Sequence, residues 1–362
     1  MTLAVEAEGL NRYARQILRA RDDVTAIREY LGRYADAGTG GELHNLAKDG
    51  HENAVRVVDG TLNRLMCLLD VSAPELDRAA AYYRRTDLDS AARVDRTLPD
   101  TASRAPTPLE AELAAYDCPP PPFSDARQVS MSLVEPGDVD KPPNALGWMD
   151  YISPSSWANA AFDAVFGFDP LGWVQERVFG DWEALARMEP VVTNVGGALH
   201  AVAQNVQTGA TALTTIWQGD AGNAAYRYFT DLANAASALR GPLDKIGDAY
   251  RGVADAVWAI GEALTGVIKA LLDAAIIAGI AIAAGTATSW TGVGAVAGYG
   301  VAAAEIAYML RLWGQATALY QNLSAAVNSF RALLGTHLSG LESVTLPALP
   351  GGGGYDHPLV QR

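Results

Sequence analysis

The stretch VGGALHAVAQNVQTGATALTTIWQGDAGNAAYRYFTDLANAASAL, residues 195–239, contains two apolar seams separated by a short break. Before the break, apolar or small residues recur every three or four positions, at Val195, Leu199, Val202, Val206, Gly209, Leu213 and Ile216. The same spacing follows the break, at Ala225, Tyr228, Leu232, Ala235, Leu239, Leu243, Ile246, Tyr250, Val253 and Val257. This spacing places apolar side chains on one face of a helix. The break contains Trp217 and Gly219, and glycine allows a tight turn. We therefore predict two long helices that pack antiparallel across a turn at these two residues.

Residues 1–98 show the same plan. One seam comprises Leu10, Tyr13, Ile17, Ala20, Val24, Ile27, Leu31 and Tyr34. A glycine-rich turn with Gly38 and Gly40 follows it. The next seam comprises Leu43, Leu46, Val58, Leu62, Leu65 and Leu69. Because proline favours the first turn of a helix, we expect a helix to restart at Pro74 and to continue to about Val94.

The remaining segments complete an all-α prediction. Residues 99–150 are rich in proline and acidic side chains, with PPPP at 119–122, and this composition predicts an extended or poorly ordered linker. Residues 151–345 are predicted to be a second helical module, and residues 346–362 a flexible tail. The expected architecture is therefore two coiled-coil-like hairpin modules with an apolar hairpin near the C-terminus.

That apolar hairpin is predicted within residues 270–312, where residues 274–304 contain no charged side chain. A turn is expected between Thr286 and Gly294, flanked by helices near the lower limit of the ~20 residues that span a bilayer. Two interpretations stand. Burial against the rest of the bundle is favoured because alanine and glycine contribute little insertion energy, and insertion into a membrane is the alternative.

Composition excludes several classes of function. The net charge of −14, without a basic cluster, argues against binding to nucleic acid. The first residues, MTLAVEAEGLNRYARQ, lack a basic region followed by an apolar run, so no Sec signal peptide is expected. Cys67 lies in an apolar run and is expected to be a buried thiol, with Cys118 unconstrained, in preference to a disulfide.

No catalytic residue, cofactor or metal site is expected. The five histidines, His44, His51, His200, His337 and His357, lack metal-ligand spacing. No nucleophile motif, phosphate-binding loop or dinucleotide loop is present, and the glycines at 351–354 precede no helix. The sequence therefore argues against an enzyme.

The stretch GDWEAL…AVAQNV…IWQGDAGNAAYRYF within residues 181–265 resembles the Trp-x-Gly helical hairpins of the Esx family, which are substrates of type VII (ESX) secretion systems. Residues 1–98 resemble the Esp-type secretion-associated family through Leu76-x-x-Ala79-Ala80-x-Tyr82-Tyr83-Arg84-Arg85-Thr86-Asp87. The first module departs from the Trp-x-Gly pattern, because Gly38-Thr39-Gly40 stands at its turn.

Tyr83-x-x-x-Asp87 is similar to the Tyr-x-x-x-Asp/Glu export signal of these substrates, which implies an ATPase of the secretion machinery as a partner. On a helix, positions four apart share one face, so we expect the ring and the carboxylate to form one patch. Tyr83 follows Gly38 by 45 residues, which places it near the open end of a hairpin with equal arms. Trp258 and Glu262 resemble a degenerate signal, but an ordinary helix pair is the favoured interpretation.

The resemblance implies a secreted or cell-envelope protein without enzymatic activity. Such a protein acts through helix–helix interaction with itself, as a homo-oligomer, or with a helical partner protein. One alternative is a pore or anchor that inserts residues 274–304 into a membrane. A further alternative is the delivery portion of a polymorphic toxin, against which the lack of a domain after residue 345 argues.

Overall fold

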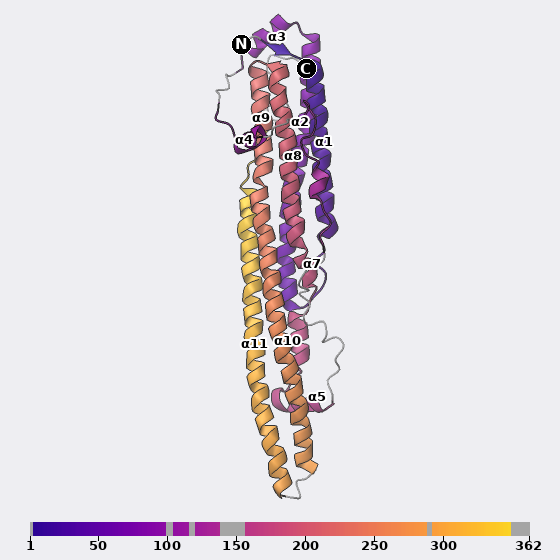
Figure 1. The fold of residues 1–362 in the computed structure, drawn as a ribbon, viewed down its shortest axis with the longest axis vertical. Helices are drawn as coiled ribbons and strands as arrows, with labels where there is room; N and C mark the ends of the chain where they lie inside the picture. The colour runs from indigo at the N-terminus through magenta and orange to yellow at the C-terminus, as the bar shows by residue number, and fades with distance from the viewer. Residues whose placement is uncertain (1–2, 99–103, 116–119, 138–155, 288–291, 349–362) are drawn as a thin grey trace.

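The computed structural model confirms an all-α protein. It describes residues 3–98, 104–115, 120–137, 156–287 and 292–348. The long helices run along a narrow, elongated molecule (Figure 1). They are α1 (Ala7–Tyr34), α2 (Glu42–Arg85), α8 (Met188–Ile216), α9 (Asp220–Ala238), α10 (Arg240–Ala287) and α11 (Gly292–Glu342). In the view of Figure 1, α1, α2, α8 and α9 reach the upper end, and α10 and α11 alone form the lower tip.

Short elements cover the bundle. They are α3 (Leu88–Asp95), α4 (Pro108–Ala114), the 3-10 helix η1 (Val129–Ser132), α5 (Ser156–Phe166), α6 (Pro170–Val178) and α7 (Trp182–Ala186). Among the described residues, the named strands are two short ones, β1 (Ala4–Val5) and β2 (Trp217–Gln218), which pair antiparallel.

The two modules share one core. Helix α1 packs against α8, and α2 packs against both α1 and α11. The buried Tyr13 of α1 donates a hydrogen bond to the Val206 carbonyl oxygen of α8, 3.1 Å away. At this crossing a side chain on Gly209 would collide with the Tyr13 ring, so the glycine allows the close approach. The first and second modules are therefore joined by buried contacts rather than separated by a linker.

The described parts of the predicted linker are folded onto this core. In α4, Thr107 and Glu110 form a capping box, which starts the helix in spite of the surrounding prolines. Phe123 and Val129 are buried, and the Arg19 guanidinium pairs with the Asp125 carboxylate at 2.7 Å. For these parts the prediction of an extended or poorly ordered linker is wrong, because scattered apolar side chains are buried on the bundle.

Two predicted boundaries in the first module also differ. Helix α2 continues through Pro74, where a restart was expected, because Ala73 and Leu76 remain buried on either side of the proline. The helix then ends at Arg85 instead of near Val94, since Thr86 is extended. Tertiary packing thus overrides the local effect of the proline on α2. The end of α2 lies nine residues before the predicted end at Val94.

In the second module, the expected long helix after Trp217 is interrupted at Leu239, between α9 and α10. The interruption is small, because Leu239 keeps right-handed helical dihedral angles and Pro242 stands in the first turn of α10. The predicted apolar hairpin corresponds to the distal ends of α10 and α11. Its turn falls partly on residues 288–291, outside the described residues.

Candidate functional site at the Trp217 end of the bundle

The turn after α8 is built around two glycines. Trp217 ends the helix in an extended conformation, and Gly219 has a φ of +125°, a region open to glycine alone. A Cβ on Gly219 would lie 2.6 Å from a carboxylate oxygen of Asp95. A Cβ on Gly222, in the first turn of α9, would collide with the Trp217 carbonyl oxygen. The turn therefore requires glycine at both positions, whereas the interruption between the two apolar seams indicates only Gly219.

Tyr83 and Trp217 meet at this end of the bundle. The Trp217 indole Nε1 donates a hydrogen bond to the Tyr83 hydroxyl oxygen at 3.2 Å. Their rings meet edge to face, with centroids 5.8 Å apart and an interplanar angle of 77°. Burial raises the pKa of Tyr83 to about 12, while the hydrogen bond from Trp217 acts in the opposite direction. The phenol is thus neutral at physiological pH and faces the second module.

Asp95, at the end of α3, connects the same two segments. Its carboxylate accepts hydrogen bonds from the backbone nitrogens of Asp220 and Ala221, at 3.0 and 2.8 Å. These nitrogens belong to the first turn of α9, whose backbone donors lack partners within the helix. The side chain is buried. Asp95 of the first module therefore caps α9 of the second. The sequence around Gly219 gives no sign of this cap, because Asp95 lies more than 100 residues before it.

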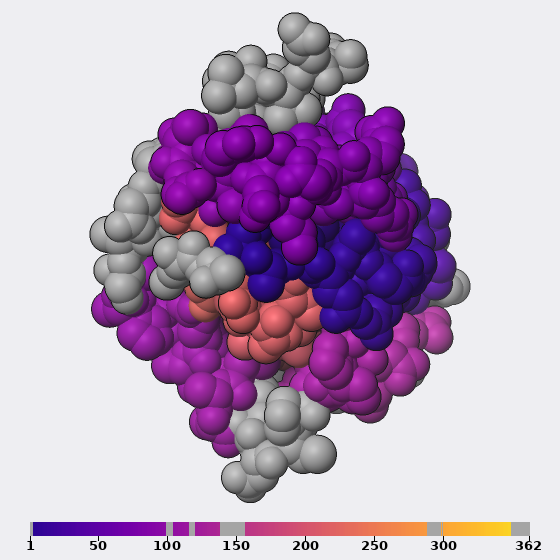
Figure 2. Space-filling view, turned by 90° about the horizontal axis from the view of Figure 1, so that it is seen from above, coloured from indigo at the N-terminus to yellow at the C-terminus, as the bar shows by residue number. Residues whose placement is uncertain are grey.

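The β1 strand closes this end from a third side. Ala4 and Val5 pair with Gln218 and Trp217 in antiparallel register. Beside this ladder, the Glu6 backbone nitrogen donates to the Ile216 carbonyl at 2.8 Å. Figure 2 looks onto this end, where indigo N-terminal residues, the purple end of the first module and salmon residues of the second lie next to one another. Three chain segments thus form one end face.

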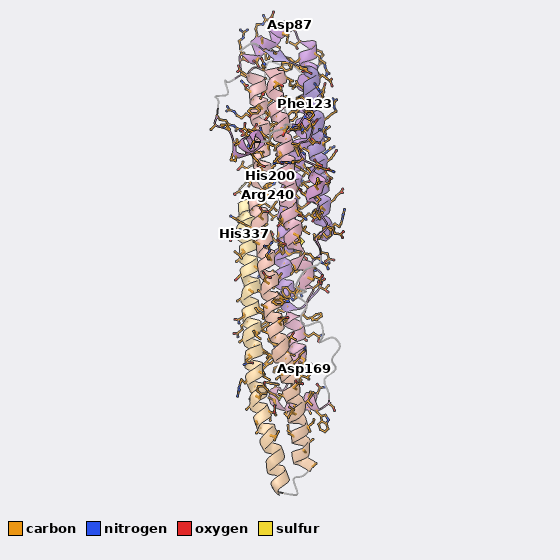
Figure 3. All side chains as sticks on the ribbon, viewed as in Figure 1. Asp87, Phe123, Asp169, His200, Arg240 and His337 are labelled. Carbon is orange, nitrogen blue, oxygen red and sulfur yellow. The ribbon has the colours of Figure 1, made fainter. Side chains whose placement is uncertain are left out.

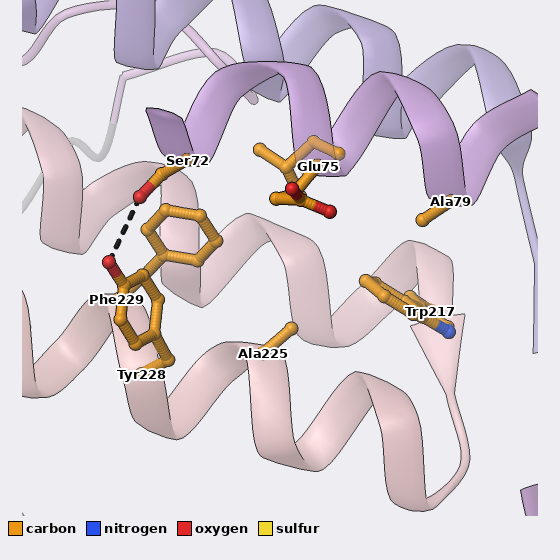
Figure 4. Close-up of a pocket in the computed structure, with 8 residues that line it drawn as sticks. Ser72, Glu75, Ala79, Trp217, Ala225, Tyr228 and Phe229 are labelled. Atoms are coloured by element: carbon orange, nitrogen blue, oxygen red, sulfur yellow. Dashed lines mark hydrogen bonds between the residues drawn. The ribbon is translucent and has the colours of Figure 1, made fainter. Parts of the chain in front are cut away.

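A small cleft lies beside Trp217 between α2 and α9 (Figure 4). It is lined by Ser72, Glu75, Leu76, Ala79, Trp217, Ala225, Tyr228 and Phe229. Ser72 donates to the Leu68 carbonyl at 2.6 Å and shares a second hydrogen bond, of 2.9 Å, with the Tyr228 hydroxyl. The exposed lining is apolar, so the cleft is a packing gap between the modules rather than a site with converging polar groups.

Asp87 takes a different position from the one expected. It is the N-cap of α3, and its carboxylate accepts a hydrogen bond from the Ser90 backbone nitrogen at 3.0 Å. Hydrogen bonding to Ser90 holds the pKa of Asp87 below its usual value. The carboxylate is exposed at the upper tip of the molecule (Figure 3). The expectation that Tyr83 and Asp87 share one helix face is therefore wrong, because α2 ends between them at Arg85.

The turn at Gly38 and Gly40 lies against the start of the second module. Gly38 has a φ of +68°, and the Gly41 nitrogen donates to the Phe179 carbonyl at 2.7 Å. The Lys48 ammonium donates to the Gly38 carbonyl, which shows that the chain before α2 runs beside the first turns of that helix. The two helices of the first hairpin also differ in length, because α2 is longer than α1.

A tryptophan does pack beside this turn, although it comes from the other module. Trp182 of α7 is buried and meets the His44 ring at 5.2 Å between centroids, edge to face. Its indole nitrogen donates to the Val178 carbonyl. The apolar plug that the first module lacks in its own sequence is thus supplied by Trp182.

Trp258 and Glu262 lie within α10, which leads away from Trp217 toward the lower tip. Trp258 is half-buried and Glu262 is exposed. The structure therefore does not bring this pair to the end face where Tyr83 and Asp87 lie.

Cys67 is exposed, which contradicts the expectation of a buried thiol. Leu65 and Leu69 of the same helix are buried, and residue 67 falls on the opposite face. Cys118 lies outside the described residues.

His51 and His200 form hydrogen bonds within the bundle. His51 contacts the Tyr250 hydroxyl and the Ala35 carbonyl, both at 2.8 Å, and His200 lies between Ser237 and Glu112. Within the part of the chain that the structure describes, no three His, Cys, Asp or Glu side chains gather as metal ligands.

Fold and site together define an elongated helical bundle in which a Trp-x-Gly turn and a tyrosine from different hairpins meet at one end. No family model, curated protein or solved structure matches the chain.

Proposed function

We propose that the protein is a non-enzymatic substrate of a type VII secretion system, and that the machinery reads the end face formed by Tyr83, Asp87 and Trp217. The hydrogen bond from Trp217 to Tyr83 is the observation that carries the proposal. Each motif is incomplete within its own module: the first lacks the tryptophan and the second lacks the tyrosine. Contact between them supplies one complete pair from two halves of the chain.

The geometry supports a division of roles within the signal. Tyr83 is largely covered and faces Trp217, so it holds the end of α2 against the turn of the second module. Asp87 projects into solvent at the start of α3, where an ATPase of the secretion machinery can contact it. After export, the protein acts through helix–helix contacts with itself or with a helical partner.

Export from a host with an active type VII system tests the proposal. Asp87→Asn is expected to keep the protein inside the cell, because it removes the exposed negative charge while the amide oxygen can still cap α3. Asp89→Asn is the matched control, because it removes an exposed carboxylate two residues away, in the first turn of α3. Protein in the culture supernatant and in the cell lysate is compared, with circular dichroism of each variant as the check on folding.

Tyr83→Phe and Tyr83→Ala test whether Tyr83 contributes to export by packing against Trp217 or through its hydroxyl group. The phenylalanine variant keeps the ring against Trp217 and is expected to retain export, whereas the alanine variant loses both packing and export. Normal secretion of both Asp87→Asn and Tyr83→Ala would contradict the proposed signal.

A further inference from the structure

The short helix α3, at the upper end of the molecule, carries charges of opposite sign at its two ends. Asp87 and Asp89 are exposed at its start, whereas Arg93 and Arg96 are exposed at its end. Leu88, which follows Asp87, is 56% exposed. At ~1.5 Å per residue, the two pairs of charges are about 10 Å apart along the helix. In Figure 2, which looks onto this end, the purple end of the first module faces the viewer.

The two arginines of α3 use only part of their hydrogen-bonding capacity within the chain. Arg93 donates from Nη2 to the Ser90 hydroxyl at 2.8 Å, and Arg96 donates from Nε to the Ala92 carbonyl at 3.1 Å. Among the described residues, neither guanidinium group forms an ion pair with a carboxylate. Because each guanidinium carries five N–H donors, most of these donors face solvent and can bind an outside acceptor.

Several arginines on the sides of the first hairpin do have carboxylate partners. Arg28 pairs with Asp59 at 2.8 Å, and Arg21 pairs with Asp70 at 2.7 Å. The chain has 41 acidic and 27 basic side chains, so carboxylates are in excess. The two unpaired arginines that lie side by side on α3 therefore do not reflect a shortage of acidic groups.

The order of these charges also suits α3 as a helix. Carboxylates at the start of a helix and cations at its end interact favourably with the helix macrodipole. The dipole accounts for the signs of the charges, and Asp87 also serves as the N-cap. It does not account for the exposed Leu88 beside them, because an apolar side chain gains nothing from the dipole. A polar rim around an apolar contact is instead the arrangement of a protein–protein interface.

The arginine end of α3 and Asp87 belong to one surface. Hydrogen bonding to Ser90 holds the pKa of Asp87 below its usual value, and the positive charge of Arg93 adds a smaller effect in the same direction. Arg93 is therefore close enough to act on the Asp87 carboxylate, although the two form no ion pair. A protein that contacts Asp87 also meets Arg93.

In the proposed function a secretion ATPase contacts Asp87, and the present inference rests on that contact. We propose that the ATPase surface that binds α3 is dipolar, with carboxylates that pair with Arg93 and Arg96 and a basic group that meets Asp87. An apolar site between these charges takes Leu88. Such a surface fixes the direction in which the end face docks, because the reversed orientation brings like charges together. An anionic lipid or nucleic-acid surface fits less well, since it would repel Asp87 and Asp89.

Binding of the full chain to the purified type VII secretion ATPase of the host tests the dipolar surface. Affinity is measured at low and at high salt, and it should fall as salt screens the charges. Arg93→Glu combined with Arg96→Glu should weaken binding about tenfold or more, because two attractive charges become repulsive. Lysine at both positions keeps the charge and should stay within about twofold of the unmodified chain.

Arg56→Glu combined with Arg64→Glu is the matched control. Both arginines are exposed on α2 and, among the described residues, lack an ion pair. They lie more than ~30 Å along α2 from its end at Arg85, and their replacement changes the net charge by the same amount. This variant should bind like the unmodified chain, and circular dichroism and urea unfolding check the fold of each variant.

Two results would overturn the dipolar surface while leaving the proposed function in place. One is that Asp87→Asn weakens binding to the ATPase whereas the Arg93 and Arg96 double glutamate variant binds normally. The other is that the double variant loses binding only in proportion to a loss of helicity, which would assign the arginines to the helix dipole. If the unmodified chain did not bind the ATPase at all, the proposed function and the dipolar surface would both be wrong.

Two further results would assign the arginines to something other than an ATPase surface. Equal losses in the α2 control and in the α3 double variant would reduce the effect to net charge. Vesicles that contain phosphatidylglycerol test a lipid surface in place of a protein. Arginine-dependent binding of the unmodified chain to these vesicles would overturn the inference, because the anionic surface would then be lipid.

Discussion

The Trp217 indole nitrogen lies 3.2 Å from the Tyr83 hydroxyl oxygen, although 134 residues separate them in the chain. The contact joins the open end of the first hairpin to the turn of the second. Around it, α3 and β1 provide further contacts through Asp95 and the Ala4–Val5 strand. The stability of this end face is therefore a property of both modules together.

Substitution of either Tyr83 or Trp217 should destabilise the protein, because each removes the hydrogen bond between them. We expect Tyr83→Phe to lower the free energy of unfolding by about 1 kcal/mol, because the Trp217 donor loses this acceptor. Trp217→Phe should cost more, since it also leaves unfilled volume. In urea unfolding, the double variant should show a coupling energy of about 1 kcal/mol. Additive effects of the two substitutions would mean that the hydrogen bond contributes nothing.

Two glycines should respond to alanine with opposite signs. Gly219→Ala places a side chain at a φ of +125° and against Asp95, and should destabilise the protein by about 1–3 kcal/mol. Gly252 lies in the interior of α10 with no atom near its absent side chain. Gly252→Ala should therefore stabilise by about 0.5–1 kcal/mol. Thermal and urea unfolding measure both, and a stabilising Gly219→Ala would refute the strained turn.

Asp95 should behave as a helix cap supplied from a distance. Asp95→Ala removes the acceptor of the Asp220 and Ala221 backbone nitrogens, with an expected loss of about 1–2 kcal/mol. Asp95→Asn keeps one acceptor oxygen and should cost less. Asp89→Ala, on the exposed side of α3, should change stability by less than about 0.5 kcal/mol. Hydrogen exchange at the start of α9 should increase in Asp95→Ala, and unchanged exchange there would argue against capping.

His51 should make the stability depend on acid. The Ala35 carbonyl can only accept, so Nε2 of His51 donates to it and Nδ1 accepts from the Tyr250 hydroxyl. Burial, with Lys48 acting in the same direction, lowers the pKa of His51 below 6.5. The unfolded chain therefore takes up a proton first as the pH falls, and stability that is present above about pH 6.5 is lost below it.

The test compares the unmodified chain with His51→Gln in urea unfolding at pH 7 and pH 5. The variant should be less stable at pH 7 and should lose less stability on going to pH 5, with the remaining loss assigned in part to His44, whose pKa burial also lowers. His337→Gln, on the outer helix α11, is the control. An identical pH dependence in His51→Gln and the unmodified chain would exclude His51 as the source.

Periodicity alone predicted the all-α class, because the seams of α1, α8 and α9 are regular over many turns. The Trp217 turn was also visible as an interruption between two such seams. The continuation of α2 through Pro74 could not be predicted from the local sequence, because it depends on the burial of Ala73 and Leu76 in the bundle. Phe123 and Val129 were hidden for a related reason, because a segment judged by its average composition conceals single apolar residues that become buried.

The site was predicted in part. The spacing of Tyr83 from Gly38 placed it at the open end of the first hairpin, where it lies. The separation of Asp87 from the helix of Tyr83 had a local signal in the sequence, since Asp is a preferred N-cap. Asp95 had none, because the backbone nitrogens that it caps belong to residues 125 and 126 positions further along the chain.

The pairing of Ala4–Val5 with Trp217–Gln218 has a consequence for the order of synthesis. A ribosome makes the first strand of this ladder more than 200 residues before the second, so the end face is absent from every chain that ends before Trp217. Tyr83 on such a product has no Trp217 to cover it. A receptor that requires the finished end face thereby accepts only cargo in which the second module has been made and has folded against the first.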